Sequence, residues 1–467
     1  VVEPCSNGLG SDGFAIVWMK DKMYGMNSSG HSPYAISADQ IDEIPKRGWI
    51  PVTVPGAVKG WKALSERFGS LPFKKLLEPA IDYAKNGYPV SAEIARMWKK
   101  ALNAIPNSEE FKGWYETFTF DGKTPEPGQM ICMPKLADAL EKIADTNTDA
   151  LYYGELASRI DEESRKFGGF LRKKDLEDHK VEWVDPIHVN YHGYQVWELP
   201  PNGQGIVALM ALNILNNFQF KTRDVDCIHT QMEALKMAFA DAKEYVTDSK
   251  CMEMPVRDLI SVDYGKQRAN QIKHMALPPR VDKPHGSGTV YLCTADKDGN
   301  MVSYIQSNYM GFGSGIVVDG VSLQNRGYDF SLDPTHVNYL MPHKKTYHTI
   351  IPGFLTKDNK PIGPFGVMGG YMQPQGHMQV VTNMIDFHLN PQMALDAKRF
   401  QWIENKKFIL EPGFDENIIS ELKKRGHEIE IEEELAMFGR GQIIVRLENG
   451  VYIAGCESRT DSNIACY

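Results

Sequence analysis

The chain has 467 residues, of which 42% are hydrophobic and 24% charged, a composition typical of a globular protein with a large buried core. Its net charge of −9 leaves no excess positive charge to neutralise a phosphate backbone, so nucleic acid is not expected as a partner. No stretch approaches about 18 uninterrupted apolar residues, so the sequence predicts no membrane span.

Cysteine and histidine spacing gives no sign of a metal or a disulfide framework. The seven cysteines are scattered and never form Cys-x-x-Cys, which favours reduced thiols, and the 13 histidines show no His-Glu-x-x-His spacing. We therefore expect no metal and no cofactor. The chain begins with Val1, so we expect its natural start, with any signal peptide, to be missing; as it stands it is assigned to the cytoplasm.

The first segment contains a formal Gly-x-Gly-x-x-Gly at Gly8, Gly10 and Gly13. A dinucleotide site needs a strand before these glycines and a helix after them, whose N-terminus holds the pyrophosphate. Here the glycines lead into a β-branched and aromatic strand predicted over 14–18. We therefore interpret the motif as an accidental match.

The next part of the chain reads as mostly helical. Apolar spacing, with Pro at starts and Gly at ends, predicts helices over 55–69, 71–84, 91–104, 134–145, 151–166, 204–218 and 227–247. Alternating β-formers over 181–199 predict two strands. Residues 255–288 predict a helix pair that ends in an exposed loop over 278–288.

The character then changes to strands separated by turns. A hairpin is predicted from strands 289–295 and 301–308, joined by the turn that contains Asp298-Gly299. The remaining predicted strands are 315–323, 349–356, 364–368, 441–446 and 450–455, and the remaining predicted helices are 375–388, 392–397 and 415–425. Sheets flanked by helices in both halves predict a layered α/β sandwich.

Thr289 stands at the outer end of the predicted hairpin, directly after Gly288. If the peptide bond between them is cut, Thr289 becomes a nucleophile with its own base, because a free α-amine has a pKa of about 7.7–8.0. Taken alone, a Gly-Thr pair at a strand start is common and carries little weight.

Gly369 and Gly370 lie in a glycine-rich turn between a predicted strand and a predicted helix. Consecutive glycines let backbone N–H groups approach a substrate closely, as an oxyanion hole for acyl transfer requires. An ordinary left-handed turn explains the same pair equally well.

Many ordered segments resemble the γ-glutamyltranspeptidases and related cephalosporin-acylase-like proteins, which are N-terminal-nucleophile hydrolases. The resemblance covers the whole chain and includes the Thr289 segment and the Gly369-Gly370 turn. It is also carried by Ser6-Asn-Gly-Leu-Gly-Ser-Asp-Gly-Phe, Val54-Pro-Gly-Ala-Val-Lys-Gly, Phe73-Lys-Lys-Leu-Leu-Glu-Pro-Ala-Ile, Gly168-Gly-Phe-Leu-Arg-Lys-Lys-Asp-Leu, Pro200-Pro-Asn-Gly-Gln-Gly, Glu233-Ala-Leu-Lys-Met-Ala-Phe-Ala-Asp, Gly311-Phe-Gly-Ser-Gly, Asp329-Phe-Ser and Glu457-Ser-Arg-Thr-Asp.

The resemblance implies a four-layer αββα sandwich made by one self-cleaving precursor. The cut would fall between Gly288 and Thr289, giving an N-terminally truncated large-subunit-like segment, 1–288, and a small-subunit-like segment, 289–467, packed together. Thr289 would first attack the Gly288 carbonyl in an N-to-O acyl shift, and later carry the acyl group of a donor that water or an amine then removes.

The resemblance also assigns residues. It implies that Gly369 and Gly370 form the oxyanion hole, that Asp329 binds the donor's α-amino group, and that Ser307, where the family places a Thr, helps to activate the nucleophile. Without the resemblance, Asp329 would be interpreted as a turn or capping residue.

Several donor-binding positions depart from the family pattern. Ser29 replaces the Arg that holds the donor carboxylate, and His31 lies nearby as a partial substitute. The family Ser-Ser that helps to hold the same carboxylate is replaced by His348-Thr349. The candidate donor-binding residues are therefore His31, Tyr309, Asn325, Arg326, Asp329, His348 and Thr349. Arg326 either binds the donor carboxylate from a new position or forms a salt bridge that leaves Asp329 unavailable to the donor.

The segment between Asp329 and Tyr347 is short compared with the lid insert of typical family members, so an open cleft and bulkier acyl groups are expected. The leading interpretation is an amidohydrolase or acyltransferase acting on γ-glutamyl amides such as glutathione. A glutaryl-type or cephalosporin-type acylase with the same nucleophile is one alternative. An unprocessed, non-catalytic binding protein is the other, and a homo-oligomer is allowed in each case.

Overall fold

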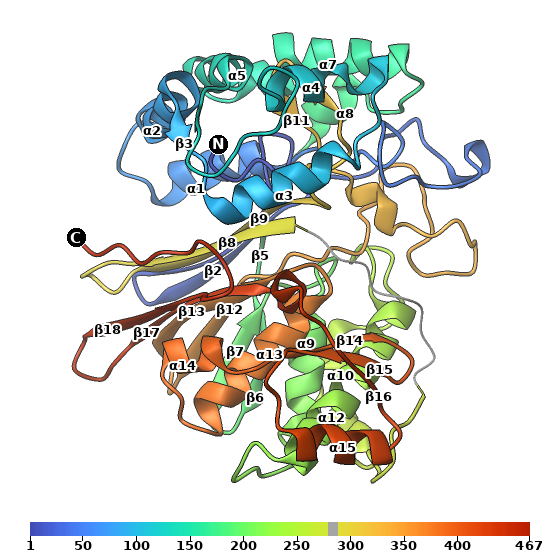
Figure 1. Cartoon of the computed structure of the whole chain (residues 1–467), viewed down its shortest axis with the longest axis vertical. Helices are drawn as coiled ribbons and strands as arrows, with labels where there is room; N and C mark the ends of the chain where they lie inside the picture. Colours follow the sequence, from blue (N-terminus) through green and yellow to red (C-terminus); the bar gives the residue numbers. More distant parts are fainter. Residues whose placement is uncertain (279–287) are drawn as a thin grey trace.

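The computed structural model of the protein describes residues 1–278 and 288–467. Two antiparallel sheets face each other across the middle of the molecule, with helices above and below them (Figure 1). The first sheet runs in the order β5-β2-β1-β9-β8, with β1 at Asp12–Met19, β2 at Lys22–Ser28, β5 at Glu182–Val184, β8 at Gly288–Ala295 and β9 at Met301–Tyr309.

The second sheet has six strands and lies against the first through β8 and β9. Its order is β18-β17-β13-β12-β7-β6, with β6 at Ile187–Tyr191, β7 at Tyr194–Glu198, β12 at Gly353–Lys357, β13 at Lys360–Met368, β17 at Arg440–Arg446 and β18 at Tyr452–Cys456. Each sheet therefore combines strands from residues 1–278 with strands from residues 288–467.

Strand β1 illustrates why the two sheets stack. Phe14, Ile16 and Trp18 point into the core between the sheets, whereas Ala15 and Val17 point to the opposite face, as the two-residue period of a strand requires. All five side chains are buried, so β1 has no face toward water. From the second sheet, Phe354 stacks on Trp18 with 6.1 Å between ring centroids.

Helices cover the outer face of each sheet, which completes four layers (Figure 1). Helix α1 (Ala57–Phe68) packs on β1 and β2. Beyond it lies a helical cap with its own hydrophobic core. The cap contains α2 (Phe73–Asn86), α3 (Ala92–Leu102), α4 (Lys112–Phe118), α5 (Pro134–Asp145), α6 (Asp149–Tyr152), α7 (Glu155–Lys166) and α8 (Lys173–Asp178).

On the other side, α9 (Gly205–Leu215), α13 (Met372–Ile385) and α14 (Pro391–Asp396) pack on the second sheet. Helix α10 (Val225–Tyr245) lies behind α9. The outer elements are α11 (Val256–Leu259), α12 (Val262–Ala269), α15 (Glu416–Lys424) and a small sheet of β14 (Phe400–Glu404), β15 (Lys407–Leu410) and β16 (Glu428–Ile431).

Several predicted elements differ from the structure. Residues 181–199 form three strands rather than two, because β6 and β7 make a tight hairpin at His192-Gly193 while β5 joins the other sheet. The single strand predicted over 315–323 is a hairpin of β10 (Val317–Val318) and β11 (Val321–Ser322), and the helix predicted over 151–166 breaks at Gly154.

Other elements were not predicted at all. These are β2, α4, α8, the small sheet of β14, β15 and β16, and the pair formed by β3 (Tyr88–Pro89) and β4 (Met130–Ile131). The loop predicted over 278–288 lies almost entirely outside the described residues. Among the described helices, none is both long and apolar enough to cross a membrane.

Replacing Phe354 with Ala should destabilise the fold by about 3–5 kcal/mol, because the side chain is fully buried between the sheets and leaves a cavity there. Chemical or thermal unfolding measures the loss. Leu292→Ala, on β8 but 43% exposed, is the matched control and should cost less than about 1 kcal/mol. Equal losses in the two variants would contradict the stacked-sheet core.

Candidate active site

The β8–β9 hairpin holds Thr289 at an irregular point in its pairing. Gly288 pairs with Tyr309 and Val290 pairs with Gln306, so Thr289 alone faces two residues, Ser307 and Asn308. A bulge of this kind breaks the regular ladder and redirects a side chain. It gives the Thr289 hydroxyl a partner on the neighbouring strand.

The Ser307 hydroxyl lies between Thr289 and the bond that would be cut. Because a carbonyl oxygen can only accept, Ser307 Oγ donates to the Gly288 carbonyl at 2.8 Å, and Thr289 Oγ1 therefore donates to Ser307 Oγ at 3.0 Å. The Tyr309 amide also donates to Ser307 Oγ, at 2.8 Å. Thr289 and Ser307 are completely buried, so water does not compete for these bonds.

This arrangement can move a proton without an external base. As Thr289 Oγ1 attacks the Gly288 carbonyl carbon, its proton can pass to Ser307 Oγ while the Ser307 proton passes to the carbonyl oxygen. The α-nitrogen of Thr289 is still an amide in the uncut chain and cannot act as the base. Ser307 is thus positioned to assist such an attack.

The glycine pair follows β13 and precedes α13. Gly369 has φ 136° and Gly370 φ 58°, both in the region where a side chain is strained, so the turn requires glycine. Gln204 fixes this turn: its side-chain amide donates to the Gly370 carbonyl at 2.8 Å and to the Thr349 carbonyl at 2.6 Å. Gln204 was not among the predicted site residues, although it lies in the family match over Pro200–Gly205.

Asp329, in the short helix η3 (Arg326–Asp329), lines a cavity of about 590 Å³ together with Tyr347 and Tyr371. The Tyr309 hydroxyl donates to Asp329 Oδ1 at 2.5 Å and the Tyr371 hydroxyl donates to the same atom at 3.3 Å. Burial raises the pKa of Asp329 to about 6, against the opposing effect of Arg326.

Tyr309 therefore connects the two halves of the site. Its amide contacts Ser307 beside Thr289, and its hydroxyl contacts Asp329 at the cavity. Thr289 itself lines a second, smaller cavity of about 270 Å³ with Met368. The predicted nucleophile and the predicted donor residue are thus joined through one tyrosine.

Arg326 is buried beside Asp329. Its Nη1 lies 3.6 Å from Asp329 Oδ2, too far for a good hydrogen bond, and donates instead to the Thr349 hydroxyl at 2.7 Å. The guanidinium also lies over the Tyr309 ring, 4.1 Å from its centroid. Arg326 Nε and Nη2 and Asp329 Oδ2 have no hydrogen-bond partner among the described residues, and all three atoms are buried.

The profile of the gamma-glutamyltranspeptidase family matches residues 1–467. The chain belongs to this family. The glutathione hydrolase-like YwrD proenzyme of Bacillus subtilis (strain 168) is 36% identical over 480 residues, covering 99% of this chain and 90% of that protein. The oxamate amidohydrolase proenzyme of Klebsiella pneumoniae subsp. pneumoniae is 30% identical over 488 residues, covering 100% and 92%.

A solved structure is also similar. The crystal structure of cephalosporin acylase from Bacillus halodurans matches with a TM-score of 0.97 and 50% sequence identity, covering all of this chain and 89% of that one. The gamma-glutamyltranspeptidase family and the layered α/β sandwich expected from the sequence are therefore confirmed.

Within this family fold, the replaced positions make internal contacts. His348, fully buried, lies 3.0 Å from a carboxylate oxygen of Asp12, a residue that pairs across β1 and β9 with Ser307. Burial lowers the pKa of His348 and raises the pKa of Asp12 to about 7. Asp12 was not among the predicted site residues, although it lies in the family match that begins at Ser6.

Two further candidates, Asn325 and His31, and Ser29 at the family's Arg position make contacts within the protein. Ser29 donates to Asn27, and Asn325 bonds backbone groups on both sides, donating to the Lys46 carbonyl at 2.8 Å. His31 stacks on His343 with 4.1 Å between centroids. Burial lowers the pKa of His31 to about 3, so it is neutral near pH 7 and lacks the charge needed to replace a carboxylate-binding Arg.

Ser307→Ala should slow cleavage of the Gly288–Thr289 bond by about 100-fold, because the proton path through its hydroxyl is lost. Gel analysis of freshly made protein over time measures the rate. Ser307→Thr keeps a hydroxyl and should retain most of it, and Ser303→Ala, a buried serine on the same strand, is the matched control. Normal cleavage in Ser307→Ala would remove Ser307 from the mechanism.

Proposed function

We propose that this protein is a self-processing amidohydrolase and acyltransferase that cleaves γ-glutamyl amides such as glutathione through an ester on Thr289. The hydrogen-bonded group of Thr289, Ser307 and the Gly288 carbonyl carries the proposal. Membership of the gamma-glutamyltranspeptidase family and relatives named as proenzymes support it.

The first reaction is cleavage of the chain. Thr289 Oγ1 forms a bond to the Gly288 carbonyl carbon, the peptide C–N bond breaks, and the nitrogen takes a proton to become the free α-amine. Water then hydrolyses the resulting ester, releasing the Gly288 carboxylate and regenerating the hydroxyl. Because Thr289 is fully buried in the uncut chain, we expect this step also to open the nucleophile to its donor.

The second reaction uses the same hydroxyl with its new base. The α-amine takes the Thr289 proton as Oγ1 attacks the donor amide, and returns it to the departing amine. Backbone N–H groups at Gly369 and Gly370 would stabilise the oxyanion, an interaction worth about 3–4 kcal/mol of barrier per donor. Water or an acceptor amine then resolves the acyl-enzyme.

The two fragments are expected to stay together after cleavage. Each of the two sheets contains strands from both segments, and the core between the sheets is shared. Separation would expose that core to water, at a cost that scales with the apolar area.

The Arg326–Asp329 pair favours a second candidate, an acylase acting on monoamides of dicarboxylic acids. The guanidinium lies beside the carboxylate that would receive a donor's ammonium group, and it repels that ammonium while offering two unpartnered donors to a carboxylate. The similar structure titled cephalosporin acylase supports the same candidate.

Thr289→Ala should remain a single chain without activity, because no hydroxyl is left to attack Gly288 or a donor. Denaturing mass spectrometry should find residues 1–288 and 289–467 as separate species in the unmodified protein and full-length chain in the variant. Thr294→Ala, further along β8, is the control and should cleave normally. A full-length, uncut and inactive unmodified protein would favour the non-catalytic alternative.

The pH dependence of donor choice separates the two candidates. A γ-glutamyl donor needs ionised Asp329, so the ratio of its kcat/KM to that of a glutaryl donor should fall as pH drops through about 6, where Asp329 takes a proton. Taking the ratio cancels titration of the shared α-amine. The measurement uses γ-glutamyl and glutaryl anilides at several pH values.

In Asp329→Asn the ratio should no longer depend on pH, because the titrating carboxylate is absent. Faster turnover of the glutaryl anilide at every pH would favour the acylase. A pH-independent ratio in the unmodified protein would mean that Asp329 does not bind the ammonium group of the donor.

A further inference from the structure

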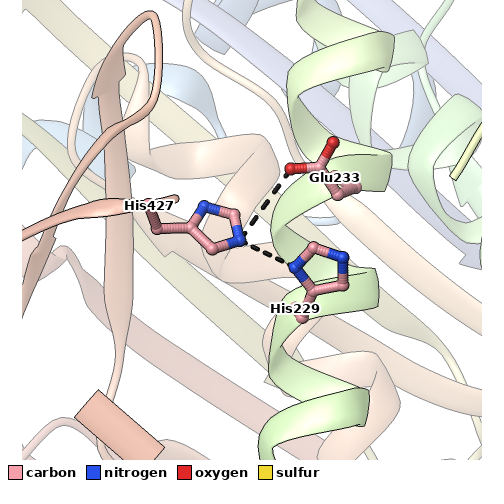
Figure 2. Close-up of side chains that lie close together, drawn as sticks. All are labelled: His229, Glu233 and His427. Atoms are coloured by element: carbon pink, nitrogen blue, oxygen red, sulfur yellow. Dashed lines mark hydrogen bonds and ion pairs between the residues drawn. The ribbon is translucent and has the colours of Figure 1, made fainter. Parts of the chain in front are cut away.

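A second cluster of buried polar side chains lies behind the sandwich, at α10. His229 and Glu233 are one turn apart on this helix, and His427 comes from the residue just before β16. Figure 2 shows the three side chains pointing toward one another from the two elements. All three are buried, with residue exposures of 3% or less.

The donor atoms of the cluster are close enough for one metal ion. One ligand atom from each residue lies within 4.8 Å of the other two. His229 Nδ1 and His427 Nε2 are 2.8 Å apart, and His427 Nε2 is 3.9 Å from Glu233 Oε1 (Figure 2). Ligand atoms on a tetrahedral zinc lie about 3.3 Å apart, so small ring rotations bring these atoms to coordination distances.

The surrounding hydrogen bonds orient two of the three ligands as in metal sites, whereas Nδ1 of His427 has no hydrogen-bond partner in the part of the chain that the structure describes. His229 Nε2 lies 2.7 Å from the Lys273 carbonyl and must donate to it, which leaves the Nδ1 lone pair facing the cluster. The Leu277 amide donates to Glu233 Oε2 at 3.2 Å, which leaves Oε1 facing the cluster. Such outer contacts fix the tautomer of a ligating histidine and the orientation of a ligating carboxylate.

We propose that His229, Glu233 and His427 form a binding site for a divalent transition metal, with Zn²⁺ the best match. Two imidazoles and one carboxylate suit zinc, with a fourth position left for water. The sequence alone predicts no metal, because it contains no His-Glu-x-x-His motif. His427 is 198 residues from His229, and only the fold brings them together.

Lys236 is the competitor for this site. Its ammonium forms a buried ion pair with Glu233 Oε1 and donates to the Leu277 carbonyl at 2.7 Å. Zinc and the ammonium cannot share the same carboxylate oxygen without strong repulsion, so metal binding must displace Lys236.

The displaced Lys236 side chain could move into a neighbouring cavity of about 420 Å³. Glu233 and Lys236 line it, and so do the acidic residues Asp241 and Glu244 on the next turns of α10. Arg268 also lines the cavity and already pairs with Asp241, so the displaced ammonium would turn toward Glu244. The same cavity gives a metal ion a route to Glu233.

The bound metal would fasten three parts of the chain. It would join α10 to the start of β16, while the outer hydrogen bonds attach residues 273–277 to the same ligands. The Ala276 amide already donates to the Arg425 carbonyl at 2.7 Å, two residues before His427. The site would therefore be structural, and independent of the chemistry proposed at Thr289.

The test uses the full chain, stripped with a chelator and re-equilibrated with Zn²⁺ alone. Elemental analysis should find one equivalent of zinc per chain, and Co²⁺ in its place should give the strong visible absorption of a tetrahedral site. His427→Gln should weaken binding by about 100-fold or more. His274→Gln, an exposed histidine in the 273–277 segment, is the matched control and should change nothing.

Lys236→Met should tighten zinc binding by about 10-fold or more, because the competing cation is gone. This gain cannot come from misfolding, and zinc should also raise the Tm of this variant more than that of the unmodified chain. Zinc well below one equivalent in the unmodified chain would overturn the proposal. So would unchanged affinity in both His427→Gln and Lys236→Met.

Discussion

The Ser307 hydroxyl, held between Thr289 and the Gly288 carbonyl, is the contact on which the rest of this site depends. It exists because the pairing of β8 with β9 is irregular at Thr289, so that one residue faces two. Burial strengthens it, since hydrogen bonds in a water-free interior meet a low dielectric. A regular ladder would point the two hydroxyls to opposite faces or out of register.

The stacked sheets shield the contact between Ser307, Thr289 and the Gly288 carbonyl from water. β8 is an edge strand of the first sheet, and it is covered by β13 and β17 of the second. The same stacking places the Gly369-Gly370 turn, at the end of β13, beside the hairpin, and Gln204 from the start of α9 fixes that turn. The hydrophobic core between the sheets thus fixes the positions of the polar groups of the site, although these groups contribute little to the core.

Buried charges distinguish this site from the family pattern. Arg326 and Asp329 lie together without a hydrogen bond, and His348, at one of the two family Ser-Ser positions, pairs with Asp12. Buried ionisable pairs are costly to form, so these two pairs are weak evidence for added stability. Under the proposed function, the charges of a donor would have to reach the buried, unpartnered atoms of Arg326 and Asp329.

Local signals in the sequence determined the long amphipathic helices, such as Pro134–Asp145, and the hairpin that begins at Thr289, because their periodicity and turn residues act over a few positions. The ordered family segments also determined the family. Only the tertiary structure decided how 181–199 divides between two sheets, that Asp12 lies opposite Ser307, and that His427 meets His229. Those contacts join residues far apart in the chain, and burial and packing rather than local propensity select them.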